Sequence, residues 1–232
     1  MEELSDRLDR IHIKIAAAAQ RARRPASSIA LIAVSKTHPA ESVREAMEVG
    51  QTLFGENRVQ ELLAKAALLP SSTHWHFIGH LQSNKVRKIL PLCELIHGVD
   101  TPELARDIDR IAEELGLYPR ILLEVNVAGE ATKFGFSPDQ VRAEIEELLS
   151  LKRVQVEGLM TIAPLAEDPE HSRPYFIELR NLRDELARCT GTPLPILSMG
   201  MSGDYEVAVE EGSTHVRIGT AIFGNRSKAT RE

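Results

Sequence analysis

The sequence lacks the marks of several protein classes. It has only two cysteines, Cys93 and Cys189, which lie far apart and form no CxxC pair, so a disulfide framework is excluded and a reducing compartment is expected. Lys and Arg number 28 against 34 Asp and Glu, a net charge of −6, which gives no general attraction to nucleic acid. No apolar run approaches membrane-spanning length, and the acidic start lacks a signal-peptide pattern. We expect a cytoplasmic protein with neither nucleic-acid nor membrane partners.

The chain also lacks a low-complexity linker and an internal repeat. Its 232 residues fit one large α/β barrel or two small domains. Apolar segments that read as strands alternate with helical patterns, and we predict strands at 29–34, 52–54, 75–78, 94–99, 120–127, 154–160, 195–198 and 214–218. An open doubly wound sheet is the alternative, but no GxGxxG motif follows the first strand to support it. Eight such units predict an α/β fold, a single (β/α)8 TIM barrel over residues 1–232.

The two ends of the chain differ in character. Leu4, Leu8, Ile11 and Ile15 recur at helical spacing, which predicts an amphipathic helix over about residues 3–22. This helix precedes the first strand and is therefore an addition to the barrel. The tail over about 225–232 is polar, and we expect it to fray.

The first predicted strand ends in a lysine. Residues 29–34 are all apolar, and Ser35, Lys36, Thr37 and His38 follow at once. Such a run suits a strand buried on both faces, and the carboxyl ends of barrel strands carry the chemistry of this fold. A partly desolvated lysine there would be a nucleophile that forms an imine with a carbonyl. Taken alone, this stretch favours the simpler interpretation, a lysine that extends into water.

Two loops on the same mouth suit a phosphate group. Gly200 and Ser202 follow the seventh strand, and Gly219 and Thr220 follow the eighth, the positions where barrels of this kind often bind phosphate. Ordinary turn glycines and helix caps are the alternative, and two loops at both favoured positions favour phosphate. With a strand-end lysine across the mouth, the pattern indicates a phosphorylated aldehyde, of which pyridoxal 5′-phosphate (PLP) is the obvious one.

Arg217 lies just before the second of these loops. Its guanidinium has donors and no acceptor, so facing a pyridine nitrogen it would keep the ring unprotonated and a poor electron sink. A salt bridge on the barrel floor is an equally good interpretation of Arg217 alone.

Three other residues are weaker candidates. His74 and His76 form an HxH pair, which in some barrels binds metal, but the sixth strand offers no further histidine and the eighth presents Arg217. We interpret both as structural and predict no metal site. Lys133 is a rival imine lysine, but in a glycine-bounded loop it would stay solvated and charged.

Five motifs resemble one known family. They are AVSKT at 33–37, FGENRVQE at 54–61, HFIGHLQSNK at 76–85, SMGMS at 198–202 and VRIGTAIFG at 216–224. In this order they resemble the PLP homeostasis proteins, also called the proline synthetase co-transcribed family. The resemblance implies a single barrel like the N-terminal domain of alanine racemase, of fold type III among PLP proteins.

The resemblance also implies roles for named residues. Lys36 would hold PLP as a covalent imine. Ser202, Gly219 and Thr220 would hold the phosphate, Arg217 would face the pyridine nitrogen, and Asn57 and Met199 would flank the ring. The family is not known for a catalysed reaction and is implicated in vitamin B6 homeostasis and in the balance of amino acids and keto acids.

Two function classes follow from the resemblance. One is a non-catalytic PLP carrier that hands the cofactor over, with PLP-dependent apo-enzymes as transient partners; the other is an amino-acid racemase or lyase on the same scaffold. Alanine racemase brings an opposing tyrosine from a second domain, whereas only eight residues follow Gly224 here. We therefore favour a carrier that is not an enzyme. We also expect a monomer, because no apolar seam is left once the barrel helices are packed.

Overall fold

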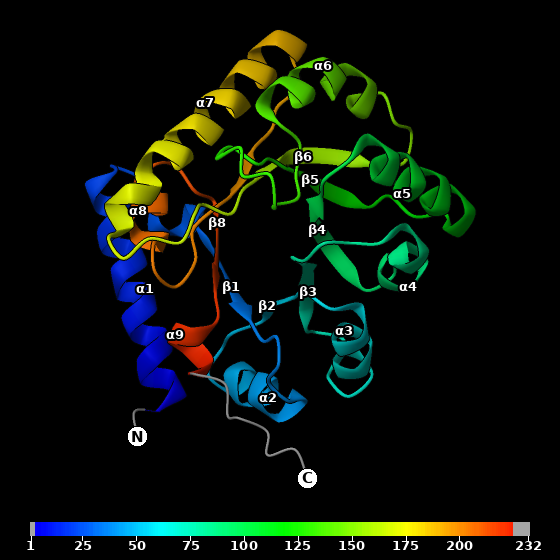
Figure 1. The fold of residues 1–232 in the computed structure, drawn as a ribbon. Coiled ribbons are helices and arrows are strands. Elements are labelled where there is room, and N and C mark those ends of the chain that lie inside the picture. The colour runs from blue at the N-terminus through cyan, green and yellow to red at the C-terminus, as the bar shows by residue number, and fades with distance from the viewer. Residues whose placement is uncertain (1–2, 225–232) are drawn as a thin grey trace.

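Eight parallel strands close into a barrel in the computed structural model, which describes residues 3–224 (Figure 1). Each strand pairs with the next in the chain, and β8 pairs with β1 to close the sheet. The strands are β1 (Ala30–Val34), β2 (Leu53–Glu56), β3 (His74–Phe77), β4 (Cys93–Val99), β5 (Arg120–Glu124), β6 (Gln155–Met160), β7 (Ile196–Ser198) and β8 (His215–Ile218). The predicted (β/α)8 barrel is confirmed. The tail predicted to fray, 225–232, lies outside the described residues.

Helices surround the barrel (Figure 1). They are α1 (Leu4–Arg21), α2 (Ala40–Glu48), α3 (Val59–Ala66), α4 (Val86–Ile89), α5 (Pro102–Leu115), α6 (Pro138–Leu149), α7 (Arg173–Thr190), α8 (Tyr205–Glu210) and α9 (Thr220–Phe223), with 3-10 turns η1 (Ala26–Ser28), η2 (Ser83–Lys85) and η3 (Pro169–Ser172). Between residues 3 and 224, no helix is both long and apolar enough to cross a membrane.

The added N-terminal helix completes the outer layer. The helices that follow the last two strands, α8 and α9, are short, and α1 packs against both of them and against α2. Its buried face contains Leu8, Ile11 and Ile15, in the spacing that predicted it. The extra helix therefore covers apolar surface that two full-length barrel helices would otherwise cover.

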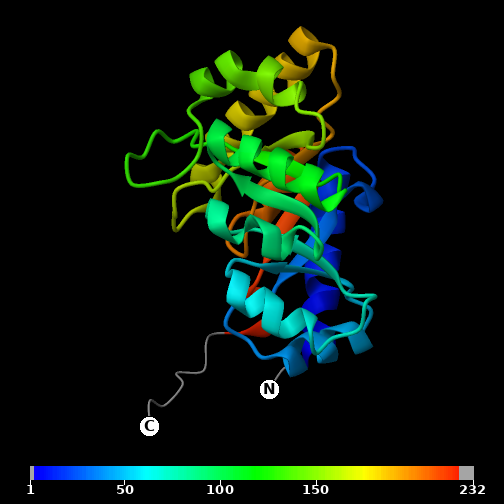
Figure 2. The same ribbon diagram turned by 90° about the vertical axis from the view of Figure 1, so that its right-hand side faces the viewer.

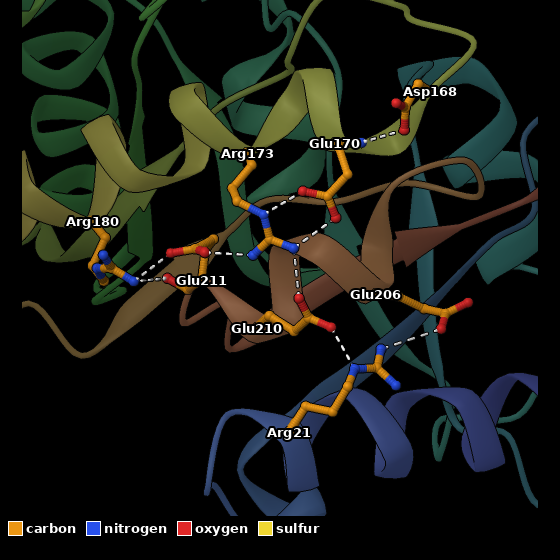
Figure 3. A network of polar contacts seen from close by, with 8 residues as sticks. All are labelled: Arg21, Asp168, Glu170, Arg173, Arg180, Glu206, Glu210 and Glu211. Atoms are coloured by element: carbon orange, nitrogen blue, oxygen red, sulfur yellow. Dashed lines mark hydrogen bonds and ion pairs between the residues drawn. The ribbon is translucent and has the colours of Figure 1, made fainter.

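Ion pairs tie α8 to its neighbours (Figure 3). Arg21 of α1 binds Glu210 at 2.6 Å, and Arg173 of α7 binds Glu210 at 2.7 Å and Glu211 at 2.6 Å. The helix so held begins directly after the loop that contains Ser202. These contacts fix the base from which that loop extends.

Side chains along each strand alternate between the outer and the inner face of the barrel and form two separate apolar clusters. Outward side chains form the main core between sheet and helices, whereas Leu95, Leu122, Met160 and Ile196 form a separate small cluster. Residues two positions further along their strands point the same way, and at the carboxyl side these are polar, as His97, Glu124 and Ser198 show. On β4, β5 and β7 the interior is thus apolar in the middle and polar toward the mouth.

One predicted strand was wrong in extent. The fifth strand was predicted over 120–127 but ends at Glu124, because Phe136 folds back and exchanges backbone hydrogen bonds with Glu124 and Asn126. Figure 2 shows this loop (green) extending beyond the barrel. The segment between the third and fourth strands contains only η2 and the four-residue α4. By contrast, the capping box of α6, formed by Ser137 and Gln140, matches the pattern that predicts its start.

Candidate functional site at the barrel mouth

The two loops expected to bind phosphate meet at the mouth. Ser202 follows β7 and is half-buried, Thr220 begins α9 and is exposed, and the Thr220 hydroxyl donates to the Ser202 hydroxyl at 3.4 Å. The residue between β8 and α9, Gly219, lies so close to β1 that an added Cβ would be 3.2 Å from the Val34 carbonyl oxygen. The absence of a side chain at Gly219 therefore lets the β8 loop approach the end of β1.

Lys36 lies beside these loops and not across the mouth as expected. The barrel closes by pairing β1 with β8, in the register Ala33 with Ile218, so the residues after both strands are neighbours. The Lys36 side chain is exposed, so the expected partial desolvation is wrong for the chain as it stands. The cause is local: Lys36 lies one residue beyond buried Ser35, where the chain turns out of the barrel.

A buried ion pair fixes the backbone that precedes Lys36. Lys65 donates to the Ser35 carbonyl at 2.7 Å and pairs with Glu56, while the Ser35 hydroxyl donates to Glu56 at 2.6 Å. Burial raises the pKa of Glu56, and the hydrogen bonds from Lys65 and Ser35 oppose that rise. Breaking such a pair on one side leaves an uncompensated buried charge, so the base of the Lys36 turn is rigidly held.

The turn itself is also constrained. Thr37 adopts a left-handed conformation with φ of 67°, which costs energy in a β-branched residue, and its N–H donates to Glu61 at 2.7 Å. The hydrogen bond to the Glu61 carboxylate offsets part of the conformational strain of Thr37, the residue directly after Lys36.

Asn57 and Met199 differ in their surroundings. Asn57 directly follows β2 and is half-buried, and its Oδ1 atom is buried without a hydrogen-bond partner. Met199 is fully buried and packs in the main core. Asn57 thus has an unsatisfied acceptor at the mouth, while a place beside a ring remains a prediction for both residues.

Arg217 lies inside the barrel, 4% exposed. Its guanidinium donates to the Ser198 carbonyl at 2.9 Å, the Ser198 hydroxyl at 2.5 Å and the Thr161 carbonyl at 2.8 Å. All three oxygens lie at the carboxyl ends of β6 and β7, and among residues 3–224 no carboxylate forms an ion pair with Arg217. The alternative of a salt bridge on the floor is therefore wrong.

The Ser198 hydroxyl joins Arg217 to a chain of hydrogen bonds. Arginine only donates, so Ser198 accepts from Arg217, and the arrangement that also uses the hydroxyl proton has Ser198 donate to His97 Nδ1, 2.8 Å away. His97 then carries its proton on Nε2 and donates it to His76 Nδ1 at 3.0 Å. Arg217 thereby sets the tautomers of two histidines beneath it.

These interior histidines are neutral. Burial lowers the pKa of His76 to about 3 and that of His215 to about 4, and it lowers the pKa of His97 as well. The structural interpretation of the HxH pair agrees with this arrangement: His76 lies in the interior, and exposed His74 pairs with Glu94 on the surface.

Other polar residues surround the mouth further from β1. His80 follows β3, hydrogen-bonds Asp100 at 2.7 Å and stacks on Phe134 with ring centroids 4.0 Å apart. Lys133, the rival lysine, is one-third exposed and pairs with Glu130 at 2.6 Å. An ammonium held by a carboxylate agrees with the charged state expected for Lys133.

Sequence reasoning missed two carboxylates of this region, Glu56 and Glu124. Each is the last residue of its strand and is nine-tenths or more buried. The available signal was a charged residue within an apolar strand pattern, FGE at 54–56 and ILLE at 121–124, because such residues are rarely buried without a partner or a role.

Comparison with known proteins gives the family. The family model described as alanine racemase, N-terminal domain, matches residues 7–227. A PLP homeostasis protein of Aquifex aeolicus is 48% identical over 222 residues, covering 95% of this chain and 97% of that one. One of Schizosaccharomyces pombe is 41% identical and covers 86% and 85% of the two chains.

Solved structures agree with this result. The structure of PipY from Synechococcus elongatus without PLP superposes with a TM-score of 0.85 at 43% identity, covering 96% of this chain and 100% of that one. The PipY structure with PLP bound gives a TM-score of 0.82 at 42% identity, with the same coverage. An alanine racemase of Clostridium difficile, 18% identical, gives 0.70 over 93% of this chain and 56% of its own, a likeness of fold alone. This chain therefore belongs to the family of PLP homeostasis proteins.

Proposed function

We propose that this protein binds PLP as an imine on Lys36 and serves vitamin B6 homeostasis by holding the cofactor and handing it over. The observation that carries the proposal is the convergence of the Ser202 and Thr220 hydroxyls beside the strand that ends at Lys36. Family membership supports it, as does the PLP bound to PipY at 42% identity.

The donor set fits PLP. A phosphate needs several hydrogen-bond donors, and two hydroxyls with the backbone around Gly219 supply them. The Asn57 Oδ1 atom is a buried acceptor without a donor, and it lies at the mouth that the cofactor would enter. When bound, PLP supplies an aldehyde that exchanges between amines, and Lys36 is the exposed amine next to the phosphate donors.

We infer that the protein is a carrier and not an enzyme. Three oxygens hold Arg217 in place. Because a guanidinium has no acceptor, its remaining N–H groups can only donate to a pyridine nitrogen. An unprotonated ring stabilises a carbanion poorly, and racemisation and elimination both require that stabilisation. The recipients in this proposal are PLP-dependent apo-enzymes of the cytoplasm, which agrees with two free cysteines.

Borohydride reduction tests the covalent claim. Purified holo-protein is reduced and digested, and the labelled peptide is mapped by mass spectrometry. We expect the label on Lys36, its loss in Lys36→Ala, and its retention in Lys133→Ala, which removes the rival lysine named above. A label on Lys133 or Lys85 contradicts the proposal.

The carrier role has its own assay. Holo-protein is mixed with a PLP-dependent apo-enzyme, and activation is followed over time against an equal concentration of free PLP. We expect activation that depends on contact with the holo-protein and persists when a scavenger removes free PLP. Activation abolished by the scavenger would refute direct hand-over and leave PLP binding intact.

A further inference from the structure

Helix α3 holds the backbone on both sides of Lys36. Lys65 donates to the carbonyl oxygen of Ser35, the residue before Lys36, at 2.7 Å. Glu61 accepts from the N–H of Thr37, the residue after Lys36, at 2.7 Å. Glu61 and Lys65 lie four residues apart on α3, so one face of one helix contacts both peptide groups that flank Lys36.

The turn around Lys36 has an unusual conformation. The N–H of His38 donates to the Ser35 carbonyl at 3.0 Å, which closes a four-residue turn with Lys36 and Thr37 at its centre. Thr37 has a φ of 67°, a value for which turns ordinarily use glycine or asparagine. Such strain persists only where the surrounding structure imposes it, and the Glu61 carboxylate is bonded directly to the strained residue.

A buried charge lies behind this turn. The Lys65 side chain is 7% exposed, and its partner Glu56 is fully buried. The Ser35 hydroxyl donates to the same carboxylate at 2.6 Å. A buried ion pair is a weak source of stability, because apolar residues of similar volume often replace it without loss. The hydrogen bond from Lys65 to the Ser35 carbonyl therefore indicates a local role, which is to fix the base of the turn.

Two fixed peptide groups determine where the side chain between them starts. A peptide group is planar, so holding the Ser35 carbonyl and the Thr37 N–H limits rotation about both backbone bonds of Lys36. The direction of the Lys36 Cα–Cβ bond is then set as well. The long, exposed side chain still rotates, but it does so from a fixed origin beside the loops that contain Ser202 and Thr220.

We propose that Glu61 and Lys65 are positioning residues, which hold the Lys36 backbone where the side-chain amine meets the aldehyde of PLP. The inference rests on the proposed function and assigns helix α3 a part in it. In the step concerned, the unprotonated Lys36 amine bonds the aldehyde carbon, and the aldehyde oxygen leaves as water with the two amine protons. Glu61 and Lys65 act on this step through geometry, because a held backbone keeps the amine within reach of the aldehyde.

The rate of imine formation tests the proposal. Cofactor-free protein is mixed with PLP, and the imine is followed by its absorbance, with Lys36→Ala as the background. We expect Glu61→Ala to form the imine roughly tenfold more slowly than wild type. Glu61→Gln keeps an oxygen that accepts from Thr37 and should restore most of the rate. Glu41→Ala, which removes an exposed carboxylate from the neighbouring helix α2, is the matched control and should leave the rate unchanged.

A second ligand separates positioning from a general loss of structure. Pyridoxine 5′-phosphate has an alcohol in place of the aldehyde, so it uses the phosphate donors without the lysine amine. We expect its affinity to be the same in wild type, Glu61→Ala and Glu61→Gln. An equal fall of this affinity and of the imine rate in Glu61→Ala would show a structural effect and overturn the proposal. An unchanged imine rate would overturn it as well.

Lys65 is tested together with Glu56, because Lys65→Met alone leaves Glu56 as an uncompensated buried charge. We expect the double variant Glu56→Gln, Lys65→Met to form the imine roughly tenfold more slowly, with unchanged affinity for pyridoxine 5′-phosphate. A rate equal to that of wild type refutes the part of Lys65. Glu61→Ala removes a partly exposed side chain, so its result does not depend on the stability of the double variant.

Hydrogen exchange examines the contact without the cofactor. The Thr37 amide should exchange severalfold faster in Glu61→Ala than in wild type, because its acceptor is lost. Equal exchange in the two proteins overturns the proposed positioning. Absence of any Lys36-dependent imine in wild type would instead refute the proposed function, while the exchange rates still decide whether α3 holds the turn.

Discussion

Replacing Ser198 by alanine should destabilise the protein more than the loss of one hydroxyl normally does. The hydroxyl accepts from Arg217 at 2.5 Å and donates to His97 at 2.8 Å, and all three residues are buried. The substitution removes a single oxygen and leaves both buried partners in place.

The magnitude follows from what is left unpaired. His97 Nδ1 loses its donor in a fully buried site, which costs about 1–3 kcal/mol. Arg217 loses one of its three oxygen partners, and a hydrogen bond to a charged group contributes about 1.5–3 kcal/mol. Because the same Nη1 still reaches the Ser198 carbonyl at 2.9 Å, the second loss is partial, and we expect a total of about 2–4 kcal/mol.

Chemical denaturation measures this loss, with Ser213→Ala as the control. Ser213 is equally buried, but its hydroxyl donates only to backbone carbonyls, for example that of Met199 at 2.8 Å, so its loss should cost about 1 kcal/mol. Equal destabilisation of the two variants would refute this hydrogen-bond chain. So would nitrogen NMR showing the proton of wild-type His97 on Nδ1.

Four further outcomes are expected. Ser202→Ala and Thr220→Val should each weaken PLP binding roughly tenfold or more, since one hydrogen bond to a charged group is lost; unchanged affinity in both places the phosphate elsewhere. Burial depresses the folded-state pKa of His76, His97 and His215, so below pH 6.5 the unfolded chain binds more protons than the folded one. The free energy of unfolding should therefore fall from pH 6.5 toward pH 3–4. A flat denaturation profile between pH 7 and 4.5 contradicts this. The exposed large apolar side chains among residues 3–224 are few and come from separate segments of the chain. Sedimentation at low micromolar concentration should therefore give a monomer, and a stable dimer would overturn that expectation. Solvent deuterium should enter the α-position of alanine no faster than with free PLP, and rapid exchange would identify an enzyme.

The sequence by itself determined the elements and their order, because the signals for them are local. The apolar run before Lys36 identifies a buried strand wherever it lies in space. The pair Ser137 and Gln140 marks a helix start through contacts three residues apart, and Gly116 and Gly191 end helices with left-handed backbones that glycine adopts without strain. Strands that alternate with helices then leave few topologies to choose from.

Only the tertiary structure decided which of these residues meet. Lys36 lies beside Gly219 because barrel closure pairs the first strand with the last, and β5 stops at Glu124 because Phe136 returns to pair with it. The chain from Arg217 joins His97 to Ser198, which lie 101 residues apart. Such contacts depend on strand register and inward alternation around the whole barrel, and a local pattern contains no information about the partner across that distance.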